Sequence, residues 1–230
     1  MKKLTLAVIS WLILTVSLSA TGLDNLSYGL TEGVRDLGRI TARPLKLNYW
    51  TSSLVLFTTM VTTLVDQPLV NYFSALKPFK PAAVILTKSV EPVGLMLLYT
   101  GFGWNNKELA RKLVGASLYT QLNVNGLKYL LGKSRPYGLN PKESPYYIGP
   151  NLNSLYNSFP SGHTAESFSL ATVLSDEFPK YRFWFYTWSS SVGLSRLILG
   201  QHFASDIFGG AALGVSSTKH YLELFETDSK

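Results

Sequence analysis

The stretch Pro160–Leu174 reads PSGHTAESFSLATVL. A serine, a glycine and then the apolar-rich run Ala165–Leu174 are typical of a helix start with Ser161 at the N-cap. The first N–H groups of a helix lack intrahelical partners, and Gly162 has no side chain to obstruct them, so this start can bind an anion. His163 follows directly. A capped helix with an incidental histidine would give the same pattern.

Uncharged stretches of helix length recur outside this segment, and none alternates like a strand. They are Leu47–Val65, Pro92–Asn106, Leu113–Leu127, Phe183–Ser195 and Ile207–Thr218. A chain of 230 residues with 46% hydrophobic content suits one compact unit. We therefore expect an all-α fold, a single-domain helical bundle.

The relation of these helices to a membrane is less clear from the sequence. A membrane-spanning helix needs about 20 predominantly apolar residues, and these stretches are shorter or contain many Thr, Ser, Asn and Gln residues. Buried helices of a soluble bundle fit better. The aromatic content of 13% and the mean hydropathy of +0.13 keep a membrane-associated variant open.

The first residues have the pattern of a secretory signal peptide. Lys2 and Lys3 precede the apolar stretch Leu4–Leu18, and small residues follow up to Gly22. We expect residues 1–22 to be a cleaved signal and residues 23–230 to be the mature domain, exported to the periplasm or cell envelope. The alternative is an uncleaved anchor, for which the apolar stretch is short.

Residues 24–43 predict an amphipathic helix with Arg35, Arg39 and Arg43 spaced four apart before Pro44. Such a stripe is either a solvated face or a membrane-surface contact. The net charge of +7 favours anionic partners, but no dense basic run indicates nucleic acid binding. Phosphate groups or anionic lipid headgroups fit better. The absence of cysteine from the sequence excludes thiolate nucleophiles and disulfides.

A second segment offers two cations. Lys128 and Arg135 are seven residues apart, which on a helix is two turns along one face, although Gly132 and Pro136 suggest that the helix loosens. A phosphate could meet both cations at such a helix end. Lys128, Lys133 and Arg135 can equally be ordinary charges favoured by the helix dipole.

The third segment places His202 four residues before Asp206, so on a helix the carboxylate can hold one imidazole nitrogen and leave the other free to attack. Arg196 supplies a planar fork for phosphate oxygens. A merely structural His–Asp pair would explain neither this arginine nor the other two segments. We expect the third histidine, His220, to be exposed and without a role.

The proline-rich segment Tyr137–Phe159 lies between the segment with Lys128 and Arg135 and the segment that begins at Pro160. Its composition predicts a long loop. It either borders the site and shapes the substrate entrance or is an ordinary surface excursion.

Together the segments resemble the type 2 phosphatidic acid phosphatase and vanadium haloperoxidase superfamily, which includes bacterial non-specific acid phosphatases. The pattern is Lys, six residues, Arg-Pro; then Pro-Ser-Gly-His; then Ser-Arg, five residues, His, three residues, Asp, and it covers about residues 113–215. The resemblance implies a mostly helical fold with the site at the ends of a helix bundle.

The resemblance also implies the site roles. His202 would attack phosphorus and become a phosphohistidine, Asp206 would orient it, and His163 would protonate the leaving alkoxide. The phosphoryl oxygens would be bound by Lys128, Arg135, Ser161, Gly162 and Arg196.

Three cationic side chains can replace the usual Mg²⁺ and would repel a dication, so we expect no metal or other cofactor and an acidic to near-neutral optimum. The expected substrate is a lipid phosphate or diphosphate, such as phosphatidic acid or an isoprenoid diphosphate, or a small soluble ester. Vanadate would act as an inhibitor.

Two alternatives remain. In a vanadate-dependent haloperoxidase, His202 would coordinate vanadate as a cofactor, but those enzymes are generally larger. A non-catalytic envelope protein would use the same cations to bind anionic headgroups.

Overall fold

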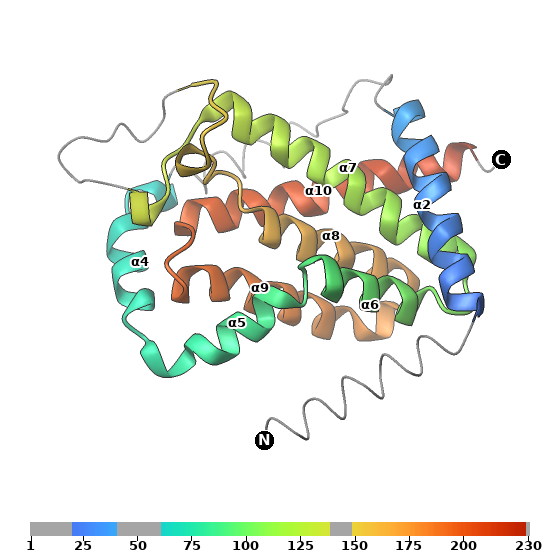
Figure 1. Ribbon diagram of the computed structural model, residues 1–230, viewed down its shortest axis with the longest axis horizontal. Helices are drawn as coiled ribbons and strands as arrows, with labels where there is room; N and C mark the ends of the chain where they lie inside the picture. Colours follow the sequence, from blue (N-terminus) through green and yellow to red (C-terminus); the bar gives the residue numbers. More distant parts are fainter. Residues whose placement is uncertain (1–19, 41–60, 139–148, 229–230) are drawn as a thin grey trace.

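A computed structural model describes residues 20–40, 61–138 and 149–228 of the chain (Figure 1). Its helices are α2 (Ala20–Ile40), α4 (Asp66–Ser74), α5 (Lys80–Lys88), α6 (Pro92–Phe102), α7 (Lys107–Leu131), α8 (Gly162–Glu177), α9 (Arg182–Ile198) and α10 (Ala204–Asp228). Short 3-10 helices occur at Lys77–Phe79, Pro136–Gly138, Ser154–Tyr156 and Pro179–Tyr181. These ranges contain no β-strand, so the predicted all-α bundle is confirmed.

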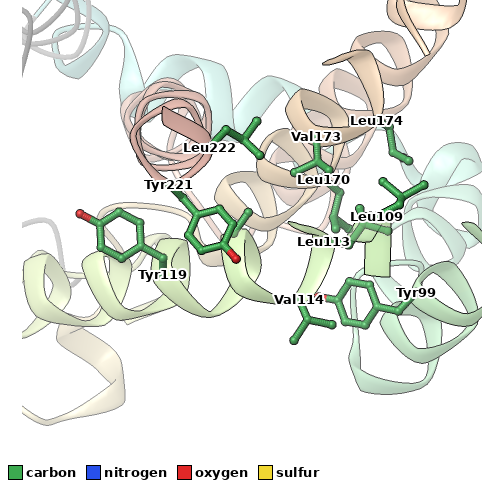
Figure 2. Packing of buried hydrophobic residues seen from close by; sticks show 11 residues of the cluster. Tyr99, Leu109, Leu113, Val114, Tyr119, Leu170, Val173, Leu174, Tyr221 and Leu222 are labelled. Atoms are coloured by element: carbon green, nitrogen blue, oxygen red, sulfur yellow. The ribbon is translucent and has the colours of Figure 1, made fainter. Parts of the chain in front are cut away.

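The main core lies where α7, α8 and α10 meet. Leu109 and Leu113 of α7 pack with Leu170 of α8, and Tyr221 of α10 lies across α7 (Figure 2). A Cβ atom on Gly115 would lie 2.0 Å from the Tyr221 hydroxyl oxygen, so only glycine admits the ring at this crossing. The core thus holds in one rigid arrangement the three helices that carry Lys128, Gly162, His163 and Asp206.

The first half of α10 lies directly on the start of α8. A Cβ atom on Gly210 would be 2.6 Å from the backbone oxygen of Ser161, and one on Gly214 would be 2.3 Å from that of Ala165. The two backbones can therefore approach only because α10 carries glycine there. The backbone N–H of Ser161 donates to the backbone oxygen of Asp206 at 2.9 Å. Close packing thus joins the second and third motif segments.

The end of α7 corrects one expectation. Gly132 has a φ of 55° and ends the helix at Leu131 with a left-handed cap whose N–H donates to the Lys128 carbonyl oxygen. Arg135 therefore does not continue the helix, and the prediction that it shares a helical face with Lys128 was wrong. It approaches Lys128 by a turn of the chain instead.

Most of the predicted helices overlap observed ones, namely α6, α7, α9 and α10. Two short helices, α4 and α5, were not predicted, because each has a proline in its first turn and only a short apolar run after it. The stretch Leu47–Val65 lies mostly outside the described residues. None of the helices within the described ranges is both long enough and apolar enough to cross a membrane.

At the N-terminal side, residues 1–19 and Arg43 lie outside the described residues, so the expected signal peptide and the third arginine of the stripe are not covered by the structure. Helix α2 begins at Ala20, inside the range expected for the signal. Arg35 and Arg39 are exposed and pair with carboxylates of their own helix. Their pairing fits a solvated face.

Candidate active site

The three motif segments meet at one end of the bundle. This is the end where α7 and α9 finish and where α8 and α10 begin (Figure 1). All eight residues predicted for the site lie at these four helix ends or in the loops beside them: Lys128, Arg135, Ser161, Gly162, His163, Arg196, His202 and Asp206.

His202 is buried between a carboxylate and a guanidinium. Its Nδ1 lies 3.3 Å from Oδ2 of Asp206, and its Nε2 lies 3.5 Å from Nη1 of Arg135. The helical argument for this pair needs correction, because His202 precedes α10 and Asp206 lies in its first turn. Asp206 Oδ2 also accepts the backbone N–H of Phe203 at 2.9 Å, so the carboxylate caps the helix while it holds the imidazole.

Asn157, which the sequence did not single out, orders two of the cations. Its side-chain oxygen accepts from Nε and Nη2 of Arg135 at 2.9 and 2.6 Å. Its backbone oxygen accepts from Nζ of Lys128 at 2.5 Å. The described part of the Tyr137–Phe159 loop therefore borders the site, as one of the two interpretations predicted. One asparagine among several in that loop carries no sequence signal.

Arg196 reaches the same end from α9. Its side chain is buried, with Nη1 3.1 Å from the Thr87 hydroxyl. Its Nε atom is also buried and has no hydrogen-bond partner among the described residues. Its backbone oxygen accepts from the backbone N–H groups of Gln201 at 2.9 Å and His202 at 3.4 Å. Arg196 thus fixes the loop that presents His202, and its guanidinium retains a free donor.

The start of α8 forms as the sequence predicted, with Ser161 at the N-cap. The Ser161 hydroxyl is buried and accepts from the Thr164 hydroxyl at 2.9 Å. A Cβ atom built on Gly162 would lie 3.9 Å from Cε of Lys128, so the glycine backbone faces the lysine side chain. A helix N-terminus and an ammonium group therefore lie side by side, which suits a phosphoryl group.

The cations of the site affect one another. Burial, followed by the charge of Arg135, lowers the pKa of Lys128 to about 8. The same two causes lower the pKa of Arg196 to about 10. Mutual repulsion of this kind requires positive groups gathered in a pocket from which water is partly excluded. An anion bound there would relieve it.

Both imidazoles lie within reach of these cations. Burial, followed by the charges of Arg196, Lys128 and Arg135, lowers the pKa of His163 to about 4. Burial lowers the pKa of His202 to about 3, although Asp206 opposes this shift. The charges of Lys128 and Arg135 lower the pKa of both rings, so the two histidines lie near the same cations. Without an anion, both rings are neutral at pH 7.

These pKa values predict that acid destabilises the protein. In the unfolded chain both rings bind protons near pH 6.5, but in the folded protein His163 does so only near 4 and His202 only near 3. Between pH 6.5 and 4 the unfolded state therefore binds more protons, and the free energy of unfolding falls by up to about 1.4 kcal/mol per pH unit for each histidine. Thermal melts from pH 7 to pH 4 measure this slope.

A His163→Asn variant provides the control for those melts. It removes one of the two groups, so its melting temperature should depend less steeply on pH than that of the unchanged protein. Equal slopes for both proteins would contradict the low pKa of His163.

Lys133 differs most from what the sequence predicted. One interpretation was that Lys133 is an ordinary charge near a helix end, and this was wrong. The side chain is fully buried, with Nζ 3.0 Å from Oδ2 of Asp66 and 2.8 Å from Oδ1 of Asp206. Asp66 lies in α4, far from any motif in the sequence, so only the fold could show this contact.

Another buried carboxyl, Glu166, lies one turn after His163 in α8. It accepts hydrogen bonds from Ser117, from Tyr99 at 3.1 Å and from Gln121 at 2.6 Å. Burial raises its pKa, although these hydrogen bonds oppose the shift. Gln121 also donates to the backbone oxygen of Gly162 at 3.4 Å. These hydrogen bonds hold the start of α8 against α6 and α7.

His220 was expected to be exposed, and this was wrong. Only 7% of its surface is accessible, and its ring lies 6.0 Å from that of Tyr119, centroid to centroid. It belongs to the packing between α7 and α10, away from the motif residues.

Relatives among characterised proteins share parts of this chain. It is 34% identical to a lipid A 1-phosphatase of Porphyromonas gingivalis over 133 residues, which are 54% of this chain and 26% of that protein. It is 28% identical to a lipid A 1-phosphatase of Rhizobium etli, covering 44% of this chain and 46% of that protein. The chain thus spans less than half the length of these relatives.

Two solved structures share the fold. LpxE of Aquifex aeolicus superposes with a TM-score of 0.57 at 24% identity, covering 69% of this chain and 95% of that one. A transmembrane PAP2 type phosphatidylglycerolphosphate phosphatase from Bacillus subtilis gives a TM-score of 0.51 at 18% identity, covering 78% and 98%. At these identities the similarity establishes the fold alone.

The family itself follows from the sequence match over the motif-bearing half. The model of the PAP2 superfamily matches residues 109–229, which is more than half of the 230-residue chain and includes all eight predicted site residues. With the site geometry and the fold in agreement, the chain belongs to the PAP2 superfamily.

Proposed function

We propose that this protein is a phosphatase that removes phosphate from lipid headgroups through a phosphohistidine intermediate and without a metal. The observation that carries the proposal is that two imidazoles, His163 and His202, lie at one end of the bundle beside the same cations, Lys128 and Arg135, whose charges act on both rings. The unpartnered Nε of Arg196 adds to it, because a phosphoryl oxygen would satisfy that donor. A protein that only bound headgroups would not need a neutral histidine held by a carboxylate.

In the first step, the lone pair on Nε2 of His202 attacks phosphorus and the bond from phosphorus to the leaving oxygen breaks. Asp206 keeps the proton on Nδ1, so Nε2 is the free nitrogen, and it is the nitrogen that faces Arg135. His163 gives its proton to the departing alkoxide. The incoming phosphate raises the pKa of His163, so the imidazole can carry that proton in the complex although it is neutral in the empty pocket.

In the second step, water attacks the phosphohistidine. His163, now neutral, accepts a proton from the water, the P–N bond breaks, and inorganic phosphate leaves with His202 restored. The cations stabilise the charge on the equatorial oxygens in both steps. Because Lys128, Arg135 and Arg196 already repel one another, phosphate binding relieves an unfavourable arrangement. Three fixed cations can thus supply the charge that Mg²⁺ supplies elsewhere.

Two kinds of observation favour a lipid substrate. The relatives from Porphyromonas gingivalis and Rhizobium etli are both named lipid A 1-phosphatases. Large apolar side chains are exposed on α5 and α9, the neighbouring helices that hold Thr87 and Arg196: Ile85 is 72%, Phe183 71% and Trp184 66% accessible. Basic residues flank them at Lys88, Lys180 and Arg182. We propose that this face lies against an anionic bilayer at the cell envelope.

A phosphate-release screen of the full chain tests substrate and metal dependence together. Lipid A, phosphatidic acid, an isoprenoid diphosphate and a nucleotide are offered in turn, each with EDTA and with added Mg²⁺. We expect release from at least one lipid, more slowly from the nucleotide, with EDTA leaving the rate unchanged and vanadate inhibiting it.

Other outcomes would point elsewhere. Phosphate release from the nucleotide alone would reject a lipid as the substrate. Loss of activity in EDTA with recovery in Mg²⁺ would reject the metal-free mechanism. Peroxide-dependent halide oxidation with vanadate, without phosphate release from any ester, would favour the haloperoxidase alternative.

A further inference from the structure

A fully buried ionic cluster lies directly behind Asp206. Nζ of Lys133 contacts Oδ2 of Asp66 at 3.0 Å, Oδ1 of Asp206 at 2.8 Å and the Ser205 hydroxyl at 2.5 Å. Lys133, Asp66 and Asp206 have no accessible side-chain surface. Burying three charges costs free energy of desolvation, and replacing buried ion pairs with apolar residues is often neutral or stabilising. A gain in stability alone therefore does not account for this cluster.

The two oxygens of Asp206 have different partners. Oδ1 accepts from Lys133, whereas Oδ2 accepts from the Ser158 hydroxyl at 2.5 Å, from the Phe203 N–H and from Nδ1 of His202. The carboxylate cannot rotate without breaking one of these contacts. Lys133 therefore determines which oxygen faces the imidazole.

Asp66 completes the cluster from α4. Its Oδ1 accepts the backbone N–H of Ser205 at 2.8 Å, and its Oδ2 accepts the Ser205 hydroxyl at 2.5 Å. Ser205 precedes Asp206 in the first turn of α10, so Asp66 fixes the backbone that presents Asp206. It lies outside residues 109–229, the part of the chain that the family model matches.

The net charge of the cluster formed by Lys133, Asp66 and Asp206 suits the proposed reaction. One ammonium and two carboxylates leave a single net negative charge behind His202. A positive charge develops on the imidazole when Nε2 attacks phosphorus, and this surplus stabilises it. Without Lys133, two carboxylates would lie buried together, and one would take up a proton.

We propose that Lys133 and Asp66 are positioning residues that keep Asp206 ionised and correctly oriented toward His202. The inference rests on the proposed phosphatase function only for its kinetic consequence, because the orientation of His202 can be measured by itself. The groups that face Asp206 are Lys133 from the loop after α7, His202 before α10, Asp66 from α4 and, at longer range, Lys128 at the end of α7.

Two variants separate positioning from folding. Lys133→Met leaves two uncompensated carboxylates and is expected to lose much stability. The double variant Lys133→Met/Asp66→Asn removes one positive and one negative charge, so the net charge behind His202 is unchanged and the protein should melt at a higher temperature than Lys133→Met alone. If the role were only structural, the double variant would recover activity together with stability.

The matched control is a partly buried ion pair remote from the site. Arg111 donates from Nε and Nη2 to Asp36 at 2.8 and 2.7 Å, and Arg111 lies about 25 Å along α7 from Lys128 at 1.5 Å rise per residue. Asp36→Asn should lower the melting temperature and leave the site unchanged.

The measurement is ¹⁵N NMR of histidine side chains in the full chain, with kinetics alongside. The sequence has three histidines, so His163→Asn and His220→Asn assign the His202 signals. In the double variant, the pH at which His202 loses its Nδ1–H tautomer should rise by about 1–3 units. The pH of the acid limb of kcat should rise by the same amount. We expect kcat to fall about 10- to 100-fold, as for outer partners of metal ligands, with KM little changed.

The outcomes are distinct. Matching shifts in both Lys133 variants, but not in Asp36→Asn, support the inference. An unchanged tautomer and titration of His202 in the double variant overturn it. Shifted His202 signals in a protein whose unmutated form releases no phosphate would retain the positioning role and reject the proposed function.

Discussion

Replacing His202 with asparagine is expected to abolish phosphate release, with a fall in kcat of about 10⁴-fold or more. Asparagine can still donate to Asp206 Oδ2 from its amide, but it offers no basic nitrogen toward phosphorus. The three site cations would remain, so substrate should still bind. Phosphate release is measured at saturating substrate, and circular dichroism and thermal melts check the fold.

His220→Asn is the matched control for that experiment. His220 is buried like His202 but packs against Tyr119, away from the motif residues. Its replacement should change stability without changing kcat by more than a small factor. Full activity in His202→Asn would remove the nucleophile assignment, whereas equal losses in both variants would point to a general structural effect.

The His163→Asn variant should show a loss that depends on the leaving group. A proton donor contributes about 10²- to 10⁴-fold, and it is needed most when the departing oxygen is strongly basic. With a lipid or alkyl phosphate the variant should lose most of its activity. With p-nitrophenyl phosphate, whose phenolate departs without a proton, the first step should be nearly unaffected. The measurement compares single-turnover rates for both ester types.

A uniform loss across leaving groups would assign His163 a different role, such as binding the phosphoryl oxygens. The Gln121→Ala variant is a useful comparison, because Gln121 links Glu166 to the Gly162 backbone and has no proton-donor role in the proposed mechanism. Its effect should be similar for alkyl and aryl esters.

The composition and the recurrence of uncharged stretches were enough to predict an all-α bundle, because apolar runs of helix length survive most tertiary contexts. The start of α8 was also readable from Ser161, whereas Gly132 suggested only a loosening of α7 and not its end. Short helices such as α4 and α5 were not, since their packing partners on α9 lie more than one hundred residues away in the sequence.

The eight residues that gather at this end of the bundle were proposed from their types, their spacing and the family resemblance, but their local geometry could not be predicted. The expected helical register between His202 and Asp206 is in reality a loop and a helix cap. Arg135 reaches the pocket after a left-handed glycine rather than along α7. Spacing constrains which residues can meet, whereas the loop conformations between them depend on contacts that one sequence does not display.

The supporting residues were beyond sequence reasoning for a related reason. Lys133 looks like any lysine near a helix end, and Asp66 like any aspartate near a helix start. Only their burial distinguishes them, with Lys133 against Asp206 and Asp66 against Lys133. Asn157 and Thr87 likewise stand out only in the structure, where each accepts a hydrogen bond from an arginine of the site.

The most direct test of the account traps the covalent intermediate. In His163→Asn, p-nitrophenyl phosphate should still phosphorylate the protein, while hydrolysis should be slow because water lacks its base. Quenching in alkali, which preserves phosphohistidine, followed by peptide mass spectrometry should find the phosphoryl group on His202. A phosphoryl group on any other residue, or a burst of p-nitrophenol with no labelled peptide, would contradict the account.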